Sequence, residues 1–209
     1  RRKMEYTTLG RTGLKVSVAG LGCGGPSRLG MRNDPQSANH AAGLVKQAMD
    51  LGINFLDTAQ NYGTEQVVGK AIAGMPRDHL VISTKKTLPP ADHANPEQEV
   101  IKGLEQSLQL IGTDYIDVYH LHGVEPKDYE FAKNRLMPPM RRLKEQGKIR
   151  FNGVTEGFVV DPKHAVLQLV DGRFHLVDLG SRNGSFLNDR RVTVPVTVRD
   201  GDRLRFGQI

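Results

Sequence analysis

The chain has 209 residues, and at about 150 residues per domain this length fits one large domain or two small ones. Hydrophobic residues make up 38% and charged residues 25%, which are ordinary globular values that exclude a wholly disordered or fibrous chain. The formal net charge is +6, but three of the positive charges are the first three residues and the others are spread along the chain. A nucleic-acid-binding surface is therefore not predicted.

The sequence has the features of a soluble, cytoplasmic protein. No run approaches the roughly 18 consecutive apolar residues that a membrane-spanning helix needs. The basic residues 1–3 are not followed by an apolar segment, so a secretory signal is not predicted. Cys23 is the only cysteine, which excludes an internal disulfide framework and suits a reducing compartment. We expect neither a membrane partner nor a metal site.

The composition changes near Phe158. Ten valines lie in the first 158 residues and nine in the last 51, whereas glutamate ends at Glu156. After Phe158 the chain contains a single lysine and a single alanine. Valine favours strands, while alanine, glutamate and lysine favour helices. We therefore predict an α/β domain over residues 1–158 and an antiparallel β segment over residues 159–209.

The first region alternates between strand and helix patterns. A helix is expected from Ser37 to the glycine at position 52, and another over residues 96–111 with Asn95 as its N-cap. Apolar runs predict five strands, at residues 16–19, 53–57, 80–85, 115–122 and 150–155. Repeated strand–helix–strand units predict a parallel sheet. Eight such units would need roughly 250 residues, so we expect an incomplete (β/α)₈ barrel of about five units.

The second region has no helical period. Residues 166–170 and 173–178 flank Asp171-Gly172, which is a strong pattern for a β-hairpin with a two-residue turn. Further short strands are expected at residues 190–192, 194–198 and 203–206. These antiparallel strands cannot supply the missing βα units of a barrel.

Polar side chains gather at the carboxyl ends of the predicted parallel strands. Asp57 ends the second strand and Tyr62 follows on the next loop, while Lys85 ends the third strand. His120 and His122 share a face near the end of the fourth strand, because side chains alternate between the two faces of a sheet. Active sites of (β/α)₈ barrels are built at this edge.

Several ordered motifs resemble the aldo-keto reductases. The residues that carry the resemblance are 57–63 (DTAQNYG), 82–85 (ISTK) and 114–123 (DYIDVYHLHG), with 9–17 and 143–150 beside them. The resemblance covers about residues 4–158. It implies a (β/α)₈ barrel that transfers a hydride between NADPH and the carbonyl carbon of a small-molecule substrate.

The resemblance also implies roles for individual residues. Tyr62 would be the proton donor, and Lys85 would lower the pKa of its phenol. Asp57 would pair with Lys85, and His122 would orient the carbonyl oxygen. A phenol with a pKa near 10 is a poor acid at neutral pH unless a nearby cation stabilises the phenolate, so these roles are physically reasonable. A surface ion pair beside two core aromatic rings is the structural alternative.

At the cofactor, the resemblance implies contacts from Asp57 and from the end of the fifth strand. Thr155 and Glu156 occupy positions where the family often holds the nicotinamide carboxamide with serine and asparagine. Glycines within residues 20–25 also satisfy a G-x-G-x-x-G pattern, but no helix opens directly on them, so a dinucleotide turn is not favoured. His120 and Cys23 are interpreted as interior structural residues.

The second region resembles the C-terminal half of a forkhead-associated (FHA) domain. The residues that carry this resemblance are 164–167, 178–188 and 201–207, and the match covers about residues 161–207. It implies a β-sandwich that binds phosphothreonine peptides, with Asn183 holding the peptide backbone and His164 in a structural position. The half that carries the family's phosphate-binding arginine has no counterpart here. Asp161 stands where the family has a phosphate-contacting serine, and its carboxylate would repel phosphate.

Three interpretations therefore remain open. The chain is an NADPH-dependent aldo-keto reductase with an incomplete barrel, a phosphothreonine-peptide-binding module, or a chimera of two families with neither activity. The first is preferred, with little turnover expected. A partial barrel leaves open sheet edges, so self-association is also expected. The identity of the substrate and the oligomeric state are not predicted.

Overall fold

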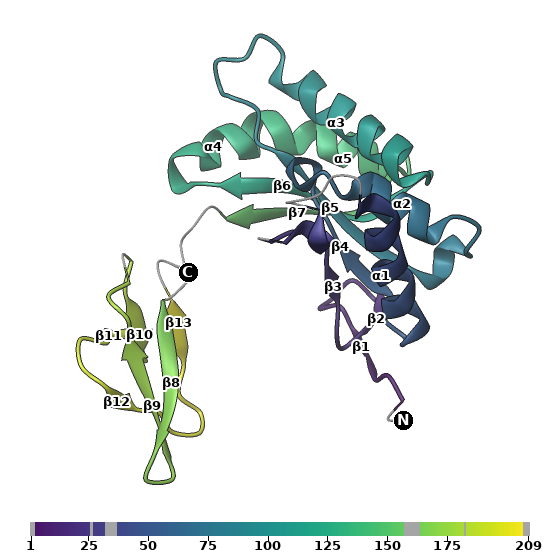
Figure 1. The fold of residues 1–209 in the computed structure, drawn as a ribbon. Coiled ribbons are helices and arrows are strands. Elements are labelled where there is room, and N and C mark those ends of the chain that lie inside the picture. Colours follow the sequence, from purple (N-terminus) through teal and green to yellow (C-terminus); the bar gives the residue numbers. More distant parts are fainter. Residues whose placement is uncertain (1–2, 26, 32–36, 157–163, 182, 207–209) are drawn as a thin grey trace. The chain divides into compact units, whose positions relative to one another are not determined.

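Figure 1 shows the fold in a computed structural model that describes residues 3–25, 27–31, 37–156, 164–181 and 183–206. The chain divides into two compact units, residues 1–155 and residues 156–209, and each is described by itself. None of the described helices is both long enough and apolar enough to cross a membrane.

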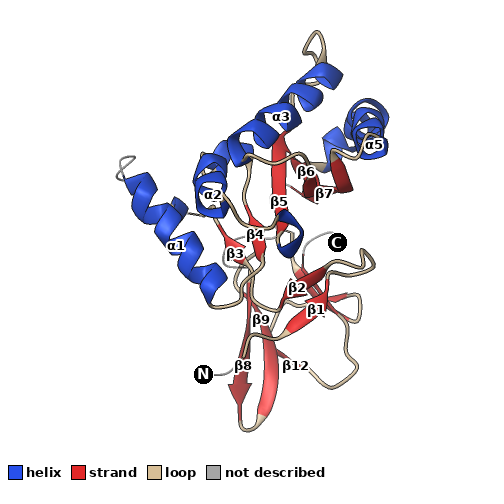
Figure 2. Cartoon of the chain, turned by 90° about the vertical axis from the view of Figure 1, so that its right-hand side faces the viewer, coloured by secondary structure: helices blue, strands red, loops and turns tan. Residues whose placement is uncertain are grey.

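The first unit is built on a five-stranded sheet with the strand order β3-β4-β5-β6-β7. These strands are β3 (Leu21–Gly22), β4 (Phe55–Asp57), β5 (Val81–Thr87), β6 (Ile116–Val124) and β7 (Ile149–Glu156). The pairs β3–β4, β4–β5 and β5–β6 are parallel. Figure 2 shows the helices along one face of this sheet: α1 (Ala38–Asp50), α2 (Glu65–Ile72), α3 (Pro96–Ile111) and α5 (Met137–Glu145). The sheet has the parallel strands and alternating helices of the predicted α/β region.

The helix α3 shows how closely local sequence sets an element. It begins at Pro96, and the Asn95 side chain accepts a hydrogen bond of 3.3 Å from the backbone N–H of Gln98. It ends before Gly112, whose φ of 71° is left-handed. The shorter helical elements are η1 (Arg28–Gly30), η3 (Gln60–Tyr62), η4 (Arg77–His79), η5 (Pro126–Asp128), α4 (Tyr129–Phe131) and the π-helical η6 (Ala132–Leu136).

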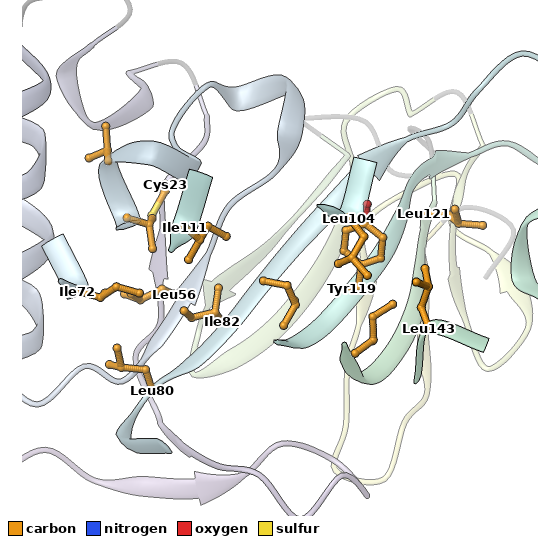
Figure 3. Close-up of a cluster of buried hydrophobic side chains, with 14 of the residues drawn as sticks. Cys23, Leu56, Ile72, Leu80, Ile82, Leu104, Ile111, Tyr119, Leu121 and Leu143 are labelled. Atoms are coloured by element: carbon orange, nitrogen blue, oxygen red, sulfur yellow. The ribbon is translucent and has the colours of Figure 1, made fainter. Parts of the chain in front are cut away.

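The main hydrophobic core lies between the sheet and these helices (Figure 3). On β4 and β5, residues of even number such as Leu56 and Ile82 point to this side and are fully buried, whereas on β6 Tyr119 and Leu121 do so. Leu104 and Ile111 of α3 pack in the same cluster, as the helical period of the sequence predicts. Residues of odd number on β4 and β5 therefore point to the opposite, inward face of the sheet. On β6 the inward residues are those of even number from Val118 onward, because Val118 pairs with Ser83.

One expected parallel strand is wrong. Residues 16–19 were assigned to the parallel sheet, but β2 (Lys15–Ser17) instead pairs antiparallel with β1 (Tyr6–Thr8). Leu14 and Val16 of this hairpin are buried in a second small cluster with Val81 and Val118. The apolar pattern reflects that burial, whereas the true first parallel strand, β3, has only two residues and too few positions to show any period.

The second unit contains two antiparallel sheets of three strands, β12-β9-β8 and β11-β10-β13. The predicted hairpin is confirmed: β8 (Ala165–Val170) pairs with β9 (Arg173–Asp178) through Asp171 and Gly172, which both have positive φ. The other strands are β10 (Ser185–Leu187), β11 (Arg190–Arg191), β12 (Val196–Thr197) and β13 (Leu204–Phe206). The sequence analysis did not predict β10, because three residues that begin with a serine show no alternation.

Candidate functional site

The candidate site lies at the carboxyl edge of the parallel sheet. Asp57 is the last residue of β4, Lys85 lies near the end of β5 and His122 lies near the end of β6. In the parallel register Asp57 lies beside Ser83, and His122 lies beside Thr87. Because Ser83, Lys85 and Thr87 share one face of β5, the three site residues lie on the inward face that the helices do not cover. Tyr62 ends the 3₁₀ turn η3, which Thr58 and Ala59 connect to β4.

Lys85 is held by three oxygen atoms. Its Nζ donates to both carboxylate oxygens of Asp57 at 2.7 Å and to the carbonyl oxygen of Thr58 at 2.8 Å. The hydroxyl of Ser83 also donates to Asp57, at 2.7 Å. The side chain of Lys85 is only 8% exposed, whereas that of Asp57 is 37% exposed. These three hydrogen bonds therefore fix the orientation of the Lys85 ammonium, which is the more buried member of the ion pair.

The ring of Tyr62 lies between Lys85 and His122. Its centroid is 5.3 Å from Lys85 Nζ, and it makes an edge-to-face contact with the imidazole of His122 at 5.6 Å and 84°. Gly24 leaves the room for this ring, because a Cβ at that position would lie 2.4 Å from Tyr62 Cε2. The sequence analysis considered other glycines of this loop but missed Gly24.

The electrostatics keep both aromatic groups neutral. Burial and the nearby carboxylate of Asp57 raise the pKa of Tyr62 above its usual value. The direction is opposite to the lowering by Lys85 that the resemblance implies, because burial comes first among the causes and the charge of Asp57 adds to it. Burial and the charge of Lys85 lower the pKa of His122, whose Nδ1 is buried and has no hydrogen-bond partner among the described residues.

Two neighbours of the site have an interior character. Burial raises the pKa of the Cys23 thiol to about 12, with Asp57 adding to the shift, so this thiol is not a nucleophile at neutral pH. His120 points inward beside Gly153, where a Cβ would lie 2.6 Å from its Nδ1. Burial lowers the pKa of His120 as well.

Thr155 and Glu156 were expected to contact the carboxamide of the cofactor, but the Thr155 hydroxyl already makes hydrogen bonds within the sheet. The hydroxyl of Thr155 accepts a hydrogen bond of 3.0 Å from the N–H of Gly123 and donates to the carbonyl oxygen of Leu121 at 3.5 Å. It therefore links β7 to β6. Glu156 ends β7, and its side chain lies outside the described residues.

Two carboxylates that the sequence analysis missed organise the first unit. Asp117 is completely buried and binds the guanidinium groups of Arg77 and Arg150. Glu65 is 2% exposed and accepts a hydrogen bond from Thr84. Both lie in or beside motifs that were recognised, but their burial depends on elements far away in the sequence. Within the described part of the chain, no group of three or more histidine, cysteine or carboxylate side chains could hold a metal ion.

In the second unit, Asn183 lies half-buried in the segment between β9 and β10. Asp178 orders this segment by accepting hydrogen bonds from the backbone N–H groups of Gly180 and Ser181 at 3.0 and 2.9 Å. The hydroxyl of Ser185 also donates to Asp178, at 2.6 Å. His164 is buried and packs edge-to-face on Phe206. Asp161 lies outside the described residues.

Comparison with known proteins assigns the first unit. The model of the aldo/keto reductase family matches residues 21–167, which is more than half of the chain. The chain belongs to the aldo/keto reductase family. An FHA domain model matches residues 135–207, so both resemblances found in the sequence are confirmed.

Relatives and solved structures agree with this assignment. L-galactose dehydrogenase of Arabidopsis thaliana is 34% identical over 158 residues, which cover 73% of this chain and 49% of the relative. The holo form of an aldo-keto reductase from Bacillus halodurans has a TM-score of 0.60 and 29% identity, covering 73% of this chain and 50% of that chain. An aldo/keto reductase from Klebsiella pneumoniae, solved with NADP and acetate, has a TM-score of 0.55 and 29% identity, covering 68% of this chain and 46% of that chain.

These matches cover only part of each relative. The chain spans between 41% and 49% of the length of the curated relatives that it matches. Five parallel strands followed by small antiparallel sheets confirm the predicted fold class, an incomplete α/β barrel with a β region. The FHA match begins at residue 135, whereas the structure places α5 and residues 149–155 of β7 in the first unit.

Proposed function

We propose that the first unit carries the proton-transfer side of an NADPH-dependent oxidoreductase site that reduces a carbonyl compound to an alcohol. One observation carries the proposal: the ammonium of Lys85, fixed by Asp57 at 2.7 Å, lies 5.3 Å from the ring centroid of Tyr62. Membership of the aldo/keto reductase family supports an oxidoreductase function.

Each side chain has a role that follows from its surroundings. The raised pKa of Tyr62 keeps its phenol protonated at neutral pH, so the phenol can give a proton to the oxygen of a carbonyl that is being reduced. The nearby ammonium of Lys85 stabilises the phenolate that remains. The neutral imidazole of His122 can donate a hydrogen bond to the carbonyl oxygen and so orient it.

A reduced nicotinamide, when bound, supplies the hydride that the carbonyl carbon accepts. The neutral, inward-facing phenol and imidazole fit that chemistry, and Asp57 borders the same space. The carboxamide contacts fit poorly, because the Thr155 hydroxyl already bridges two strands. We therefore expect the chain to bind NADPH weakly and to turn over slowly.

The test compares two tyrosine variants of the full chain at high NADPH concentration with a simple aromatic aldehyde as substrate. We expect slow aldehyde-dependent loss of NADPH absorbance that Tyr62→Phe abolishes. Tyr115→Phe is the control, because Tyr115 directly precedes β6, at the edge of the sheet opposite the site, and it should keep the rate. A rate that does not depend on the aldehyde, or that survives in Tyr62→Phe, would refute the proposal.

NADPH binding is tested separately by fluorescence titration of the full chain. We expect weak or undetectable enhancement of the nicotinamide emission. Tight binding would refute the expectation of weak binding, which the resemblance implies because the contacts to the 2′-phosphate and adenine come mainly from later units of the barrel.

The second candidate function is phosphothreonine-peptide binding by the FHA-like unit. The observation in its favour is the loop that carries Asn183, to which Asp178 is joined by four hydrogen bonds from Gly180, Ser181 and Ser185. Anisotropy of a labelled phosphothreonine peptide, compared with its unphosphorylated form and with Asn183→Ala, tests it. Equal binding of the two peptides would exclude this function, and failure of both tests would leave a chimera without either activity.

A further inference from the structure

The loop that carries Tyr62 is closed at its base by a pair of hydroxyl groups. It leaves β4 at Thr58 and enters α2 after Thr64. Both threonines are completely buried, and their Oγ1 atoms are 2.8 Å apart. Because the hydroxyl of Thr64 is engaged with Thr58, it does not cap α2. The loop is therefore a small closed unit with Tyr62 near its tip.

The end of this loop is attached to β5 by a buried carboxylate. Glu65 is the first residue of α2 and is only 2% exposed. Its Oε1 accepts a hydrogen bond of 2.6 Å from the hydroxyl of Thr84, which is itself completely buried. An acidic side chain is rarely buried without a cation, and Glu65 makes no ion pair within the described part of the chain. The helix dipole at the first turn of α2 favours its charge.

The start of the same loop is attached to the next residue of β5. Lys85 follows Thr84 directly and donates from Nζ to the carbonyl oxygen of Thr58 at 2.8 Å. Because consecutive strand residues point to opposite faces, Thr84 reaches Glu65 on the helix side while Lys85 reaches Thr58 on the inward side. Two consecutive residues of one strand thus hold the two ends of the loop.

We propose that Glu65 and Thr84 are positioning residues, which fix the ring of Tyr62 relative to Lys85 and His122. Any effect of these two residues on catalysis rests on the proposed function, whereas their effect on the position of the Tyr62 ring does not. The bond between a hydroxyl and a charged carboxylate is short and strong, so it restrains the loop more than a neutral pair would. Without the hydroxyl of Thr84, the buried carboxylate of Glu65 loses this hydrogen bond, and its need for solvation draws the end of the Tyr62 loop toward water.

The experiment follows His122 by NMR in the full chain labelled at histidine, with the resonance assigned by His122→Gln. The edge-to-face ring of Tyr62 shifts this resonance, and Tyr62→Leu gives the value without a ring. We expect Thr84→Val to lose most of the ring-induced shift, while Thr84→Ser keeps the hydroxyl and stays close to the parent chain. Glu65→Gln keeps an acceptor oxygen and should lie between Thr84→Val and the parent chain.

Thr113→Val is the matched control, because the Thr113 hydroxyl accepts a bond from Arg77 in the same unit but away from the loop. It should lower the melting temperature and leave the His122 resonance in place. The proposal is overturned if Thr84→Val lowers the melting temperature in the same way without moving that resonance. Should Thr84→Val fail to fold, an unshifted resonance in folded Glu65→Gln overturns it equally.

The same measurement separates this proposal from the proposed function. A chain that shows the expected shifts but no aldehyde-dependent oxidation of NADPH supports the positioning role and refutes the function. A chain that oxidises NADPH in an aldehyde-dependent way, but whose His122 resonance is unchanged in Thr84→Val, supports the function and refutes the positioning role.

Discussion

Removal of the carboxylate of Asp117 should cost the first unit a large share of its stability. The Asp117 side chain is completely buried on β6 and accepts from Arg77 Nη2 at 2.7 Å and from Arg150 Nη1 at 2.9 Å. It also accepts from the backbone N–H of Ile82 at 2.9 Å. One carboxylate therefore connects β5, β6, β7 and η4, and we consider the variant Asp117→Ala.

The magnitude follows from how well water can replace each lost contact. Breaking a buried ion pair from one side costs about 3–5 kcal/mol, because the remaining charge is left without its partner. Arg77 is 19% exposed and fits that case, whereas Arg150 is 48% exposed and should account for no more than about 1 kcal/mol. A change of 3–5 kcal/mol corresponds to a fall of roughly 6–20 °C in melting temperature for a unit of this size.

The assay is urea unfolding of the full chain followed by far-ultraviolet circular dichroism, with Arg150→Ala as the control. Asp117→Ala should lower the midpoint strongly and Arg150→Ala only slightly. Asp117→Asn keeps the volume and an acceptor oxygen, so its cost should fall between the two. Equal losses in Asp117→Ala and Arg150→Ala would refute the reasoning, because they would show that burial does not decide the cost.

Three further predictions concern the site, the second unit and association. Gly24→Ala should displace the ring of Tyr62, because the new Cβ would lie 2.4 Å from it, and the loss of the ring-induced shift of His122 is the measurement; an unchanged shift would contradict this. Burial alone would raise the pKa of Asp178 in the second unit, but hydrogen bonds from two serine hydroxyls and from backbone amides lower this pKa below its ordinary 3.8. Its ionised form therefore stabilises the second unit above that pH, and the melting curves of the parent chain and Asp178→Asn should converge in acid rather than run parallel. The edge strands β3 and β7 each have one neighbour in their sheet, so sedimentation velocity should detect species larger than a monomer, and a monodisperse monomer would refute this.

The elements that the sequence predicted well are those set by neighbouring residues. The helix α3 was predicted to within a residue because Asn95, Pro96 and a regular apolar face all lie within it or directly before it. The hairpin of β8 and β9 was predicted because Asp171-Gly172 adopts positive φ at both positions, as a two-residue turn requires. The inward face of the sheet followed from strand alternation alone.

The features that the sequence did not predict depend on distant residues. The hairpin of β1 and β2 was mistaken for part of the parallel sheet, because burial of Val16 against Val81 and Val118 gives the same apolar pattern. The need for glycine at position 24 arises only from the ring of Tyr62, which comes from another loop. Tertiary contacts of this kind leave no local period in the sequence.

The contacts of the site also show which part of its geometry an incomplete barrel can keep. Lys85 is held by Asp57 and Thr58, and the Tyr62 loop is held by Thr84 and Glu65, so every one of these contacts lies within residues 57–85. His122 joins them from β6, the strand next to β5. None of these bonds needs a strand beyond β7, whereas the resemblance implies that the contacts to the 2′-phosphate and adenine of the cofactor come mainly from later units of the barrel. We therefore expect this incomplete barrel to keep the geometry of the proposed proton-transfer groups while it binds the hydride donor weakly.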